Sequence, residues 1–250
     1  MKYHYFRNKQ IFVISPHLDD ALLSTGMLLT SLQPYSDITV ISIFTKGTPG
    51  PYTLSARKFI STSGCNDAVT LFEKRKLEDK KALAKIGAKH VYLEFEDALF
   101  RKKASQSLWG KILPEFSHLY PIYRFNILGN AISSRDTAPD QLKQVLKKYI
   151  PPQAIVLSPL GIGNHVDHTI TRFVCTELFP QVVYYADFPY TIRNNIFGIP
   201  PFGYKLVEFP VDIKKKQTLI NCYASQVQGL FPNGKIPPHT ELLFVPEKWL

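Results

Sequence analysis

The chain has 250 residues and a formal net charge of +10, with 45% hydrophobic and 20% charged residues. This composition can supply a sizeable core and excludes a wholly disordered chain. No apolar run approaches the ~18 residues that a membrane span requires, and the N-terminus does not resemble a signal peptide. Three widely spaced cysteines do not suggest a disulfide framework, so a cytoplasmic location is expected. The cysteines are Cys65, Cys175 and Cys222.

The positive charge is concentrated in short basic runs rather than in one long tract. The run 74–81 also contains acidic residues at helical spacing, which is typical of a solvated helix face. A weakly anionic substrate or a membrane surface is the second interpretation, and no nucleic-acid partner is expected because no nucleic-acid-binding motif accompanies the charge. The basic runs are 74–76, 80–81, 101–103, 147–148 and 214–216.

Strand-like and helical patterns alternate along the sequence. The strand-like runs are rich in Val, Ile, Tyr and Phe, and several are apolar throughout, as strands buried on both faces should be. This alternation predicts one doubly wound α/β domain over residues 1–250, with a mostly parallel sheet covered on both sides. In chain order the predicted elements are a strand at 11–15, helix 20–32, strand 38–44, helix 67–86, strand 90–95, helix 139–149, strand 154–158, helix 167–178, strand 182–186, strand 204–209 and helix 212–226.

Two segments interrupt the alternation. Residues 45–66 are rich in Gly, Pro and Ser, and residues 97–137 mix basic and aromatic residues without a clear period. Loops of this length in a compact domain are usually functional or mobile. Because both lie beyond the ends of predicted strands, we expect them to form the walls of a pocket.

The first group of candidate catalytic residues directly follows the first predicted strand. His17, Asp19 and Asp20 lie between that strand and an amphipathic stretch, and ligands of open α/β sheets bind outside the carboxyl ends of strands. At a sharp turn His17 and Asp20 can converge on one metal ion, and Asp19 would stand beside the metal's water as a general base. The structural alternative is that Asp19 and Asp20 only cap the following helix and that their negative charge interacts favourably with the helix dipole.

The second group follows the strand-like run 154–157. His168 would be the third protein ligand of a catalytic zinc site, which typically leaves one position open for water. His165, one helical turn earlier, can face the same cavity, and Asp167 could bond an imidazole and favour its protonated form. A structural or surface histidine pair is the alternative. Because both groups open helices after apolar strands and complement each other as ligands and base, a catalytic metal site is preferred.

Two motifs in these groups resemble those of a known family. Residues 15–26, SPHLDDALLSTG, resemble the N-terminal signature of the PIG-L (LmbE-like) deacetylases, and residues 164–169, NHVDHT, resemble their second signature. Supporting similarities lie at 75–79, 85–88, 185–190 and 223–226. The sequence departs from the family pattern at Leu18, where Pro is usual, and at Tyr223, where His is common. Neither departure removes an expected ligand.

The resemblance implies a Rossmann-like, three-layer α/β/α sandwich. It also implies metal-dependent removal of an N-acetyl group from a glucosamine-type sugar or sugar conjugate, with release of acetate and a free amine. His17, Asp20 and His168 would bind Zn²⁺, with Fe²⁺ as an alternative, and Asp19 would activate the zinc-bound water. The expected partner is a small N-acetylated amino sugar or glycoconjugate.

The resemblance also assigns roles to the surrounding residues. His165 and zinc would stabilise the oxyanion, either Asp19 or His165 would protonate the departing amine, and Asp167 would tune His165. Contacts with the substrate are expected from Arg75, Asn164, Asp187 and Tyr190. For Asp187 and Tyr190, a turn at a strand end combined with core packing is an equally good interpretation.

Two other functions remain open at this stage. A zinc amidase or deacylase could act on a non-sugar N-acyl substrate, because the motifs define the reaction centre and not the acceptor. A non-catalytic nucleotide- or polyanion-binding protein on the same sheet would need a glycine-rich phosphate loop after the first strand. The sequence has carboxylates there, which would repel phosphate. The aglycone and the oligomeric state cannot be inferred from these motifs.

Overall fold

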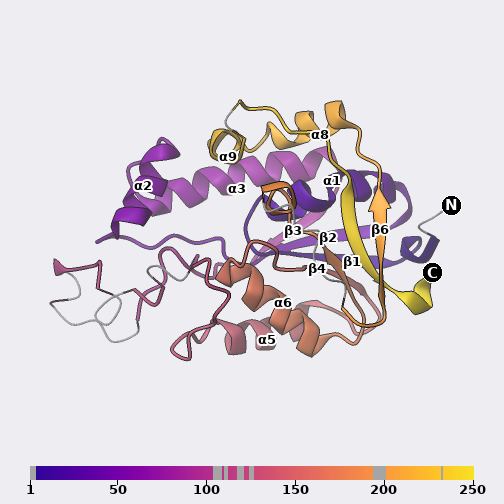
Figure 1. Ribbon diagram of the computed structural model, residues 1–250, viewed down its shortest axis with the longest axis horizontal. Coiled ribbons are helices and arrows are strands. Elements are labelled where there is room, and N and C mark those ends of the chain that lie inside the picture. Colours follow the sequence, from indigo (N-terminus) through magenta and orange to yellow (C-terminus); the bar gives the residue numbers. More distant parts are fainter. Residues whose placement is uncertain are drawn as a thin grey trace.

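The computed structural model describes residues 4–103, 109, 112–116, 121–123, 127–193, 201–231 and 233–250. Its centre is a seven-stranded sheet with the order β3-β2-β1-β4-β5-β7-β6 (Figure 1). The pairs among β1 to β5 are parallel, whereas β7 is antiparallel to both β5 and β6. The predicted α/β fold with a mostly parallel sheet is therefore confirmed. The strands are β1 (Gln10–Ser15), β2 (Asp37–Ser42), β3 (Lys89–Tyr92), β4 (Ile155–Pro159), β5 (Val182–Tyr185), β6 (Tyr204–Phe209) and β7 (Glu241–Pro246).

Helices cover both faces of this sheet, as Figure 1 shows. On one face lie α1 (Asp20–Leu32), α3 (Ala68–Lys85), α8 (Ile213–Ile220) and α9 (Ala224–Leu230), and on the other lie α5 (Ala138–Tyr149) and α6 (Val166–Leu178). Among the described residues, no helix has both the length and the hydropathy that crossing a bilayer requires. Short 3₁₀ turns lie at His4–Phe6, Gln33–Tyr35 and Glu247–Trp249.

The alternation of side chains along each strand builds a separate hydrophobic core on each face. In β1, Val13 belongs to the core beneath α1, whereas its neighbour Ile14 belongs to the core beneath α6. Val40 and Ile41 of β2 divide between the two cores in the same way. Both faces of the central strands are thus buried, which explains why their sequences are apolar throughout rather than alternating.

Three elements differ from the predicted pattern. The predicted loop 45–66 contains a helix, α2 (Leu54–Thr62), which Thr53 begins by accepting a hydrogen bond from the Ala56 N–H. The predicted helix 212–226 is divided into α8 and α9. Strand β7 was not predicted. Of the second predicted loop, residues 104–108, 110–111, 117–120 and 124–126 lie outside the described residues.

The order of the strands determines where a ligand can bind. From β1 the chain proceeds to β2 and β3 on one side, and β4 and β5 continue on the other side. Loops leaving the carboxyl ends of β1 and β4 therefore separate to opposite faces and leave a crevice between them. Helix α1 begins at Asp20 and α6 at Val166, so both predicted groups of catalytic residues lie at this crevice.

Candidate metal centre and active site

Three side chains from the two groups point at one position in the crevice. Nδ1 of His17 lies 3.1 Å from Oδ2 of Asp20, and Nε2 of His168 lies 3.2 Å from the same oxygen. The ligand atoms of all three residues lie within 4.8 Å of one another. Tetrahedral zinc with bonds of about 2.0–2.1 Å places neighbouring ligand atoms roughly 3.3 Å apart. The donor set and its spacing therefore fit a divalent cation.

Buried carboxylates orient both imidazoles. Nδ1 of His168 lies 2.6 Å from Oδ1 of Asp187, and the other Asp187 oxygen accepts the backbone N–H groups of Gly161 and Ile162. Nε2 of His17 lies 3.3 Å from Oδ2 of Asp167. Such outer carboxylates hold a metal-binding imidazole in one tautomer and orientation. They leave Nε2 of His168 and Nδ1 of His17 for the cation.

These contacts change the expected role of Asp187. Its side chain was expected to touch substrate, but it is 1% exposed and lies behind His168. Both of its oxygens are already engaged by the protein. We therefore assign Asp187 to positioning His168.

The pKa values show that this position attracts positive charge. Burial lowers the pKa of His17, but hydrogen bonds to Asp167 and Asp20 outweigh burial and raise the pKa to about 10. Burial also opposes charge on His168, yet its contacts with Asp20 and Asp187 hold its pKa well above the usual value. In the protein without metal, protons on the two imidazoles supply the positive charge that a cation would otherwise provide.

Asp167 is tied into a second buried network. Its Oδ1 accepts from Nη2 of Arg101, and its Oδ2 accepts the N–H of Ala98 at 2.9 Å. Arg101 also donates to Asp136, so one guanidinium joins two buried carboxylates. Burial would raise the pKa of Asp167, but Arg101 and the bond with His17 hold it well below its usual range. Asp167 is thus a fixed negative charge behind His17.

Asp19 lies beside the three candidate ligands but outside their set. Its side chain makes no cap hydrogen bond to α1, which argues against the simple capping interpretation. Its Oδ1 instead accepts from Nη2 of Arg75 at 3.2 Å. Burial raises the pKa of Asp19, and Arg75 opposes that shift. A buried carboxylate with a raised pKa, held by a guanidinium, suits the role of a general base.

Arg75 differs from the solvated face expected of its basic run. It is 4% exposed and lines the same cavity as Asp19. Its Nε is buried and has no hydrogen-bond partner among the residues that the structure describes. The neighbouring Lys76 pairs with Glu73 three residues earlier and with Glu94, although its side chain is only 13% exposed.

His165 faces the metal centre. The sequence suggested that its ring would be protonated, but the structure indicates a neutral ring. Its ring centroid lies 4.9 Å from that of His17. Its Nδ1 accepts the backbone N–H of Asp167 at 3.2 Å, which caps α6 and places the proton of the neutral ring on Nε2. Burial and the nearby His17 lower the pKa of His165 to about 3. The expectation that Asp167 keeps His165 protonated is therefore wrong, because the Asp167 carboxylate contacts His17 and Arg101 instead.

A second possible ligand set shares His17 and adds His165 and Asp167. Its carboxylate is already occupied by Arg101 and the Ala98 N–H, and Nδ1 of its second imidazole accepts a backbone hydrogen bond. Fewer of its lone pairs are free than in the set of His17, Asp20 and His168. The first set is therefore the better metal site.

The centre opens into a cavity of about 500 Å³, within the usual range of small-molecule sites. Tyr190, at the start of the short helix α7 (Tyr190–Arg193), lines it, and its ring lies 5.8 Å from that of His168. Asn164, an exposed residue with a φ of 60°, is not among the residues that line the cavity. The predicted loops contribute Ser55, Phe59, Asp97, Leu99, Ile127 and Leu128.

Two residues of the site were not singled out from the sequence. Oδ2 of Asp97 lies 3.5 Å from Nε2 of His17, and Asp97 lines the cavity. The sequence did contain an indication of Asp97, because this residue lies just beyond the predicted strand 90–95. The carboxyl ends of the predicted strands also carry the two groups of candidate catalytic residues. Arg101 was counted only as part of a basic run. Nothing in the local sequence indicates that its side chain turns inward to Asp167.

The two departures from the family pattern lie outside the metal centre. The Tyr223 hydroxyl donates to Asp79 at 2.7 Å, and Tyr223 is 2% exposed. Leu18 packs in a small core with Ala56 and Phe72. Both side chains support the walls of the site rather than its chemistry.

Comparisons with known proteins agree with this geometry. The profile of the PIG-L family, described as GlcNAc-PI de-N-acetylase, matches residues 12–179. No curated protein matches the sequence significantly.

Three solved structures share the fold. A deacetylase of teicoplanin biosynthesis has a TM-score of 0.66 at 21% identity, covering 94% of this chain and 96% of its own. The A40926 pseudoaglycone deacetylase Dbv21 has a TM-score of 0.64 at 23% identity, covering 96% and 97%. The N,N'-diacetylchitobiose deacetylase from Pyrococcus horikoshii has a TM-score of 0.51 at 14% identity, covering 96% and 85%. At these identities the likeness establishes the fold alone.

The family match covers more than half of the chain and includes both predicted motifs, from His17 to His168. The expected enzyme class, a hydrolytic N-deacetylase, is thereby confirmed. The chain belongs to the PIG-L family.

Proposed function

We propose that the protein is a metal-dependent deacetylase that hydrolyses the N-acetyl group of an amino sugar or of its conjugate, releasing acetate and a free amine. The observation that carries this proposal is the convergence of His17, Asp20 and the buried His168, two of which, His17 and Asp20, line a cavity. Asp19 and His165 lie beside that point. The family description, GlcNAc-PI de-N-acetylase, and the name of the similar N,N'-diacetylchitobiose deacetylase support a sugar substrate.

His17, Asp20 and His168 would hold the cation, with Zn²⁺ as the expected ion and Fe²⁺ as the alternative. A bound divalent cation supplies Lewis-acid chemistry, which makes water more acidic and polarises an amide carbonyl. Asp167 and Asp187 keep the two imidazoles in the required tautomers. The protein therefore contributes a fixed donor set that needs no rearrangement of these three side chains.

Asp19 would move the proton in both halves of the reaction. In the first half its carboxylate accepts a proton from the attacking water as oxygen bonds to the acetyl carbon. In the second half the carbon–nitrogen bond breaks, and the same proton passes from Asp19 to the departing nitrogen. Arg75 holds Asp19 in place through the 3.2 Å hydrogen bond. One water is consumed. Its second proton leaves the acetic acid product and is taken up by the amine, so that acetate and the protonated amine result at neutral pH.

His165 would stabilise the negative charge that develops on the carbonyl oxygen. Its Nδ1 accepts from the backbone, so Nε2 carries the proton and can donate a hydrogen bond as a neutral imidazole. The ring is neutral in the neutral pH range, because burial and the nearby His17 lower the pKa of His165 to about 3. A neutral imidazole keeps its single N–H proton in that range. A preorganised donor of this kind is worth about 3–4 kcal/mol in comparable oxyanion sites.

A non-sugar N-acyl substrate is the second candidate, and the apolar part of the cavity favours it. Phe59, Leu99, Ile127, Leu128 and Leu230 form walls that could also hold an acyl chain or an apolar amine. A polyanionic ligand is disfavoured, because Asp19, Asp20 and Asp97 face the same space.

Acetate release from a substrate panel tests the proposal. The panel pairs N-acetylglucosamine, N,N'-diacetylchitobiose and a lipid-linked N-acetylglucosamine with N-acetylated amino acids and alkylamines. Protein stripped of metal and reloaded with zinc, or with ferrous iron under anaerobic conditions, should release acetate from a sugar member. If only the non-sugar compounds are hydrolysed, the protein is a deacylase of non-sugar N-acyl substrates, which is the second candidate. Absence of metal-dependent turnover on both groups would refute the proposed chemistry.

A further inference from the structure

A second cavity, of about 390 Å³, lies beside the active site and shares a wall with it. The segment 96–102 forms this wall. Asp97 and Leu99 line the active-site cavity, whereas Glu96, Arg101 and Lys102 line the second one. The volume of the second cavity is within the range of small-molecule sites.

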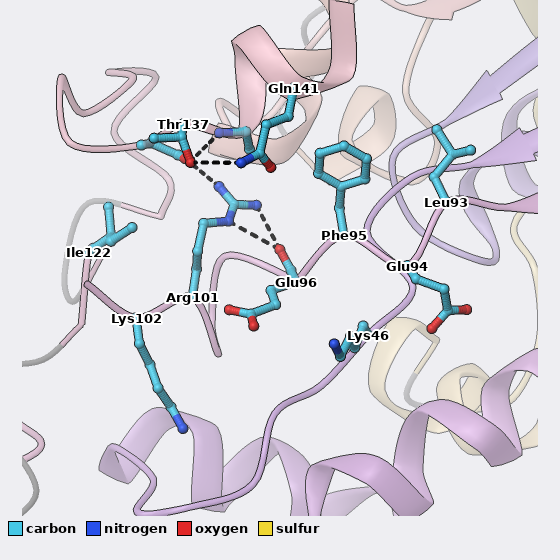
Figure 2. A pocket seen from close by; sticks show the side chains of 12 residues that line it. Lys46, Leu93, Glu94, Phe95, Glu96, Arg101, Lys102, Ile122, Thr137 and Gln141 are labelled. Carbon is cyan, nitrogen blue, oxygen red and sulfur yellow. Dashed lines mark hydrogen bonds and ion pairs between the residues drawn. The ribbon is translucent and has the colours of Figure 1, made fainter. Parts of the chain in front are cut away.

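Side chains of complementary chemistry converge on this space from separate parts of the chain (Figure 2). Thr137 and Gln141 come from the beginning of α5, and Lys46 follows β2. Figure 2 shows Thr137 and Gln141 on one side of Arg101, with Lys46 and Glu96 on the other. The apolar part of the lining consists of Leu93, Phe95, Ile122 and Ala138.

Most charges in the lining are already paired within the protein. Arg101 is neutralised by Asp136 and Asp167, and Glu94 pairs with Lys76 at 2.7 Å. Among the described residues, the ammonium of Lys46 and the carboxylate of Glu96 form no hydrogen bond or close ion pair. The lining therefore offers the ammonium of Lys46 and the carboxylate of Glu96, which also interacts electrostatically with Lys102. It adds the amide of Gln141, which donates to the Thr137 hydroxyl at 3.4 Å.

We propose that this cavity binds a saccharide unit separately from the metal centre. Sugar hydroxyls both donate and accept, so they can donate to the carboxylate of Glu96 and accept from Lys46 and Gln141. The ring of Phe95 and the side chain of Ile122 offer surfaces for the C–H face of the sugar. A multiply charged anion would meet the carboxylates of Glu94 and Glu96. A purely apolar ligand would strip water from Lys46 and Glu96 without replacing their hydrogen bonds.

The shared wall connects this site to the reaction. Nε and Nη2 of Arg101 donate to the Glu96 carbonyl at 3.1 and 2.9 Å, and Nη2 also donates to Asp167. Asp167 in turn contacts His17. A saccharide held against Glu96 and Arg101 is therefore two side chains away from a candidate metal ligand. The effect of a bound saccharide on the reaction rests on the proposed function, whereas the binding of the saccharide to the second cavity does not.

Calorimetric titration of the metal-free protein with N-acetylglucosamine and N,N'-diacetylchitobiose tests the binding. Gln141→Ala and Glu96→Gln should each weaken binding of at least one saccharide roughly fivefold, the loss expected from about one hydrogen bond. Gln144→Ala is the matched control, because Gln144 is exposed on the same helix and does not line the cavity. Affinities unchanged in both cavity variants, or weakened equally by the control, would overturn the proposal.

The saccharide could be a separate sugar or the remote unit of an oligosaccharide substrate, and turnover separates these sources. If it is the remote unit, Gln141→Ala should raise KM for the disaccharide and leave KM for the monosaccharide unchanged. If it is a separate sugar, both KM values should stay constant while the Kd of the added sugar rises. A protein that binds saccharide in this cavity but releases no acetate would retain this inference and refute the proposed function.

Discussion

Two regions of buried charge in this molecule satisfy it in different ways. In the first region, Lys216 of α8 and Glu241 of β7 are fully buried and form an ion pair. The Glu241 carboxylate also accepts the N–H groups of Met27 and Leu28, each at 2.8 Å. In this part of the molecule the chain supplies both charges and the additional hydrogen bonds that the carboxylate needs.

The metal centre is built differently. Asp20 lies between two imidazoles, and further carboxylates stand behind them at Asp167 and Asp187. Without metal, protons on His17 and His168 are what balances this charge. The difference separates a structural ion pair, which is complete within the chain, from a site that is complete only with a cation or with protons.

The largest effect is expected from Asp19, which lies at the metal centre but is not one of the three candidate ligands. Asp19→Asn should lower kcat by ~10²–10⁴, the range typical of a lost general base, while metal content stays near the wild-type value. Turnover and metal content are measured on the same preparation, with Asp140→Asn as an exposed control. Loss of metal from Asp19→Asn would mean that Asp19, and not Asp20, is the ligand.

The ion pair should respond to truncation through stability and not through chemistry. Lys216→Met leaves Glu241 charged and buried, which should cost ~3–5 kcal/mol of unfolding free energy. The double variant Lys216→Met/Glu241→Gln should recover part of this loss, and zinc should not rescue the single variant selectively. Urea denaturation with and without zinc measures these effects. If Lys216→Met were as stable as the wild type, Glu241 would not depend on Lys216 for its charge balance, and the description of this ion pair would be wrong.

Metal binding should depend steeply on pH, because the cation must displace protons. Below the raised pKa values of His17 and His168, each imidazole releases one proton on metal binding, so affinity should rise about 100-fold per pH unit near neutrality. The same protons stabilise the metal-free protein. Their contribution is fully present below pH 6.5 and is lost as the pH rises through about 10, the folded pKa of His17.

Calorimetry in buffers of different ionisation enthalpy counts the protons released by zinc at pH 7. The structure predicts about two for the wild type. Release of almost no protons would show that His17 and His168 are both neutral in the metal-free protein. The metal centre would then not differ from the Lys216–Glu241 ion pair in the way described above.

The smallest effect is expected from a residue that acts only through a ligand. Asp187→Ala should weaken zinc binding by about 10- to 100-fold, in the range of other outer-shell carboxylates. Saturating zinc should then restore most of kcat, which would distinguish positioning from direct contact with the substrate. A raised KM with unchanged zinc affinity would return Asp187 to its expected role in substrate binding.

Much of the fold was predictable because the inner strands of this sheet, such as β1, β4 and β5, are mostly buried. Each apolar run from 11–15 to 204–209 corresponds to an observed strand. Strand β7 was not predicted, because it begins with Glu241, a residue that sequence patterns place at the surface. Its burial depends on Lys216, 25 residues away. Helix α2 was missed because few of its residues are buried, chiefly Ala56 and Ile60.

The candidate ligands were also predictable, because the carboxyl ends of β1 and β4 are neighbours in any sheet of this order. The supporting contacts were not. Arg101 was counted only in a basic run, and Arg75 was expected at the substrate through the family resemblance. Only the folded chain places these side chains against Asp167 and Asp19. The protonation of His165 was predicted wrongly for the same reason, since it depends on which neighbour the Asp167 carboxylate contacts.

Metal content tests the central claim most directly. After dialysis against equimolar zinc, the wild type and the control His90→Ala, which alters an exposed histidine, should hold about one zinc per chain. His17→Ala, Asp20→Ala and His168→Ala should each lose most of it, with circular dichroism showing that the fold is retained. Full occupancy in both His17→Ala and His168→Ala would contradict the assignment of this site.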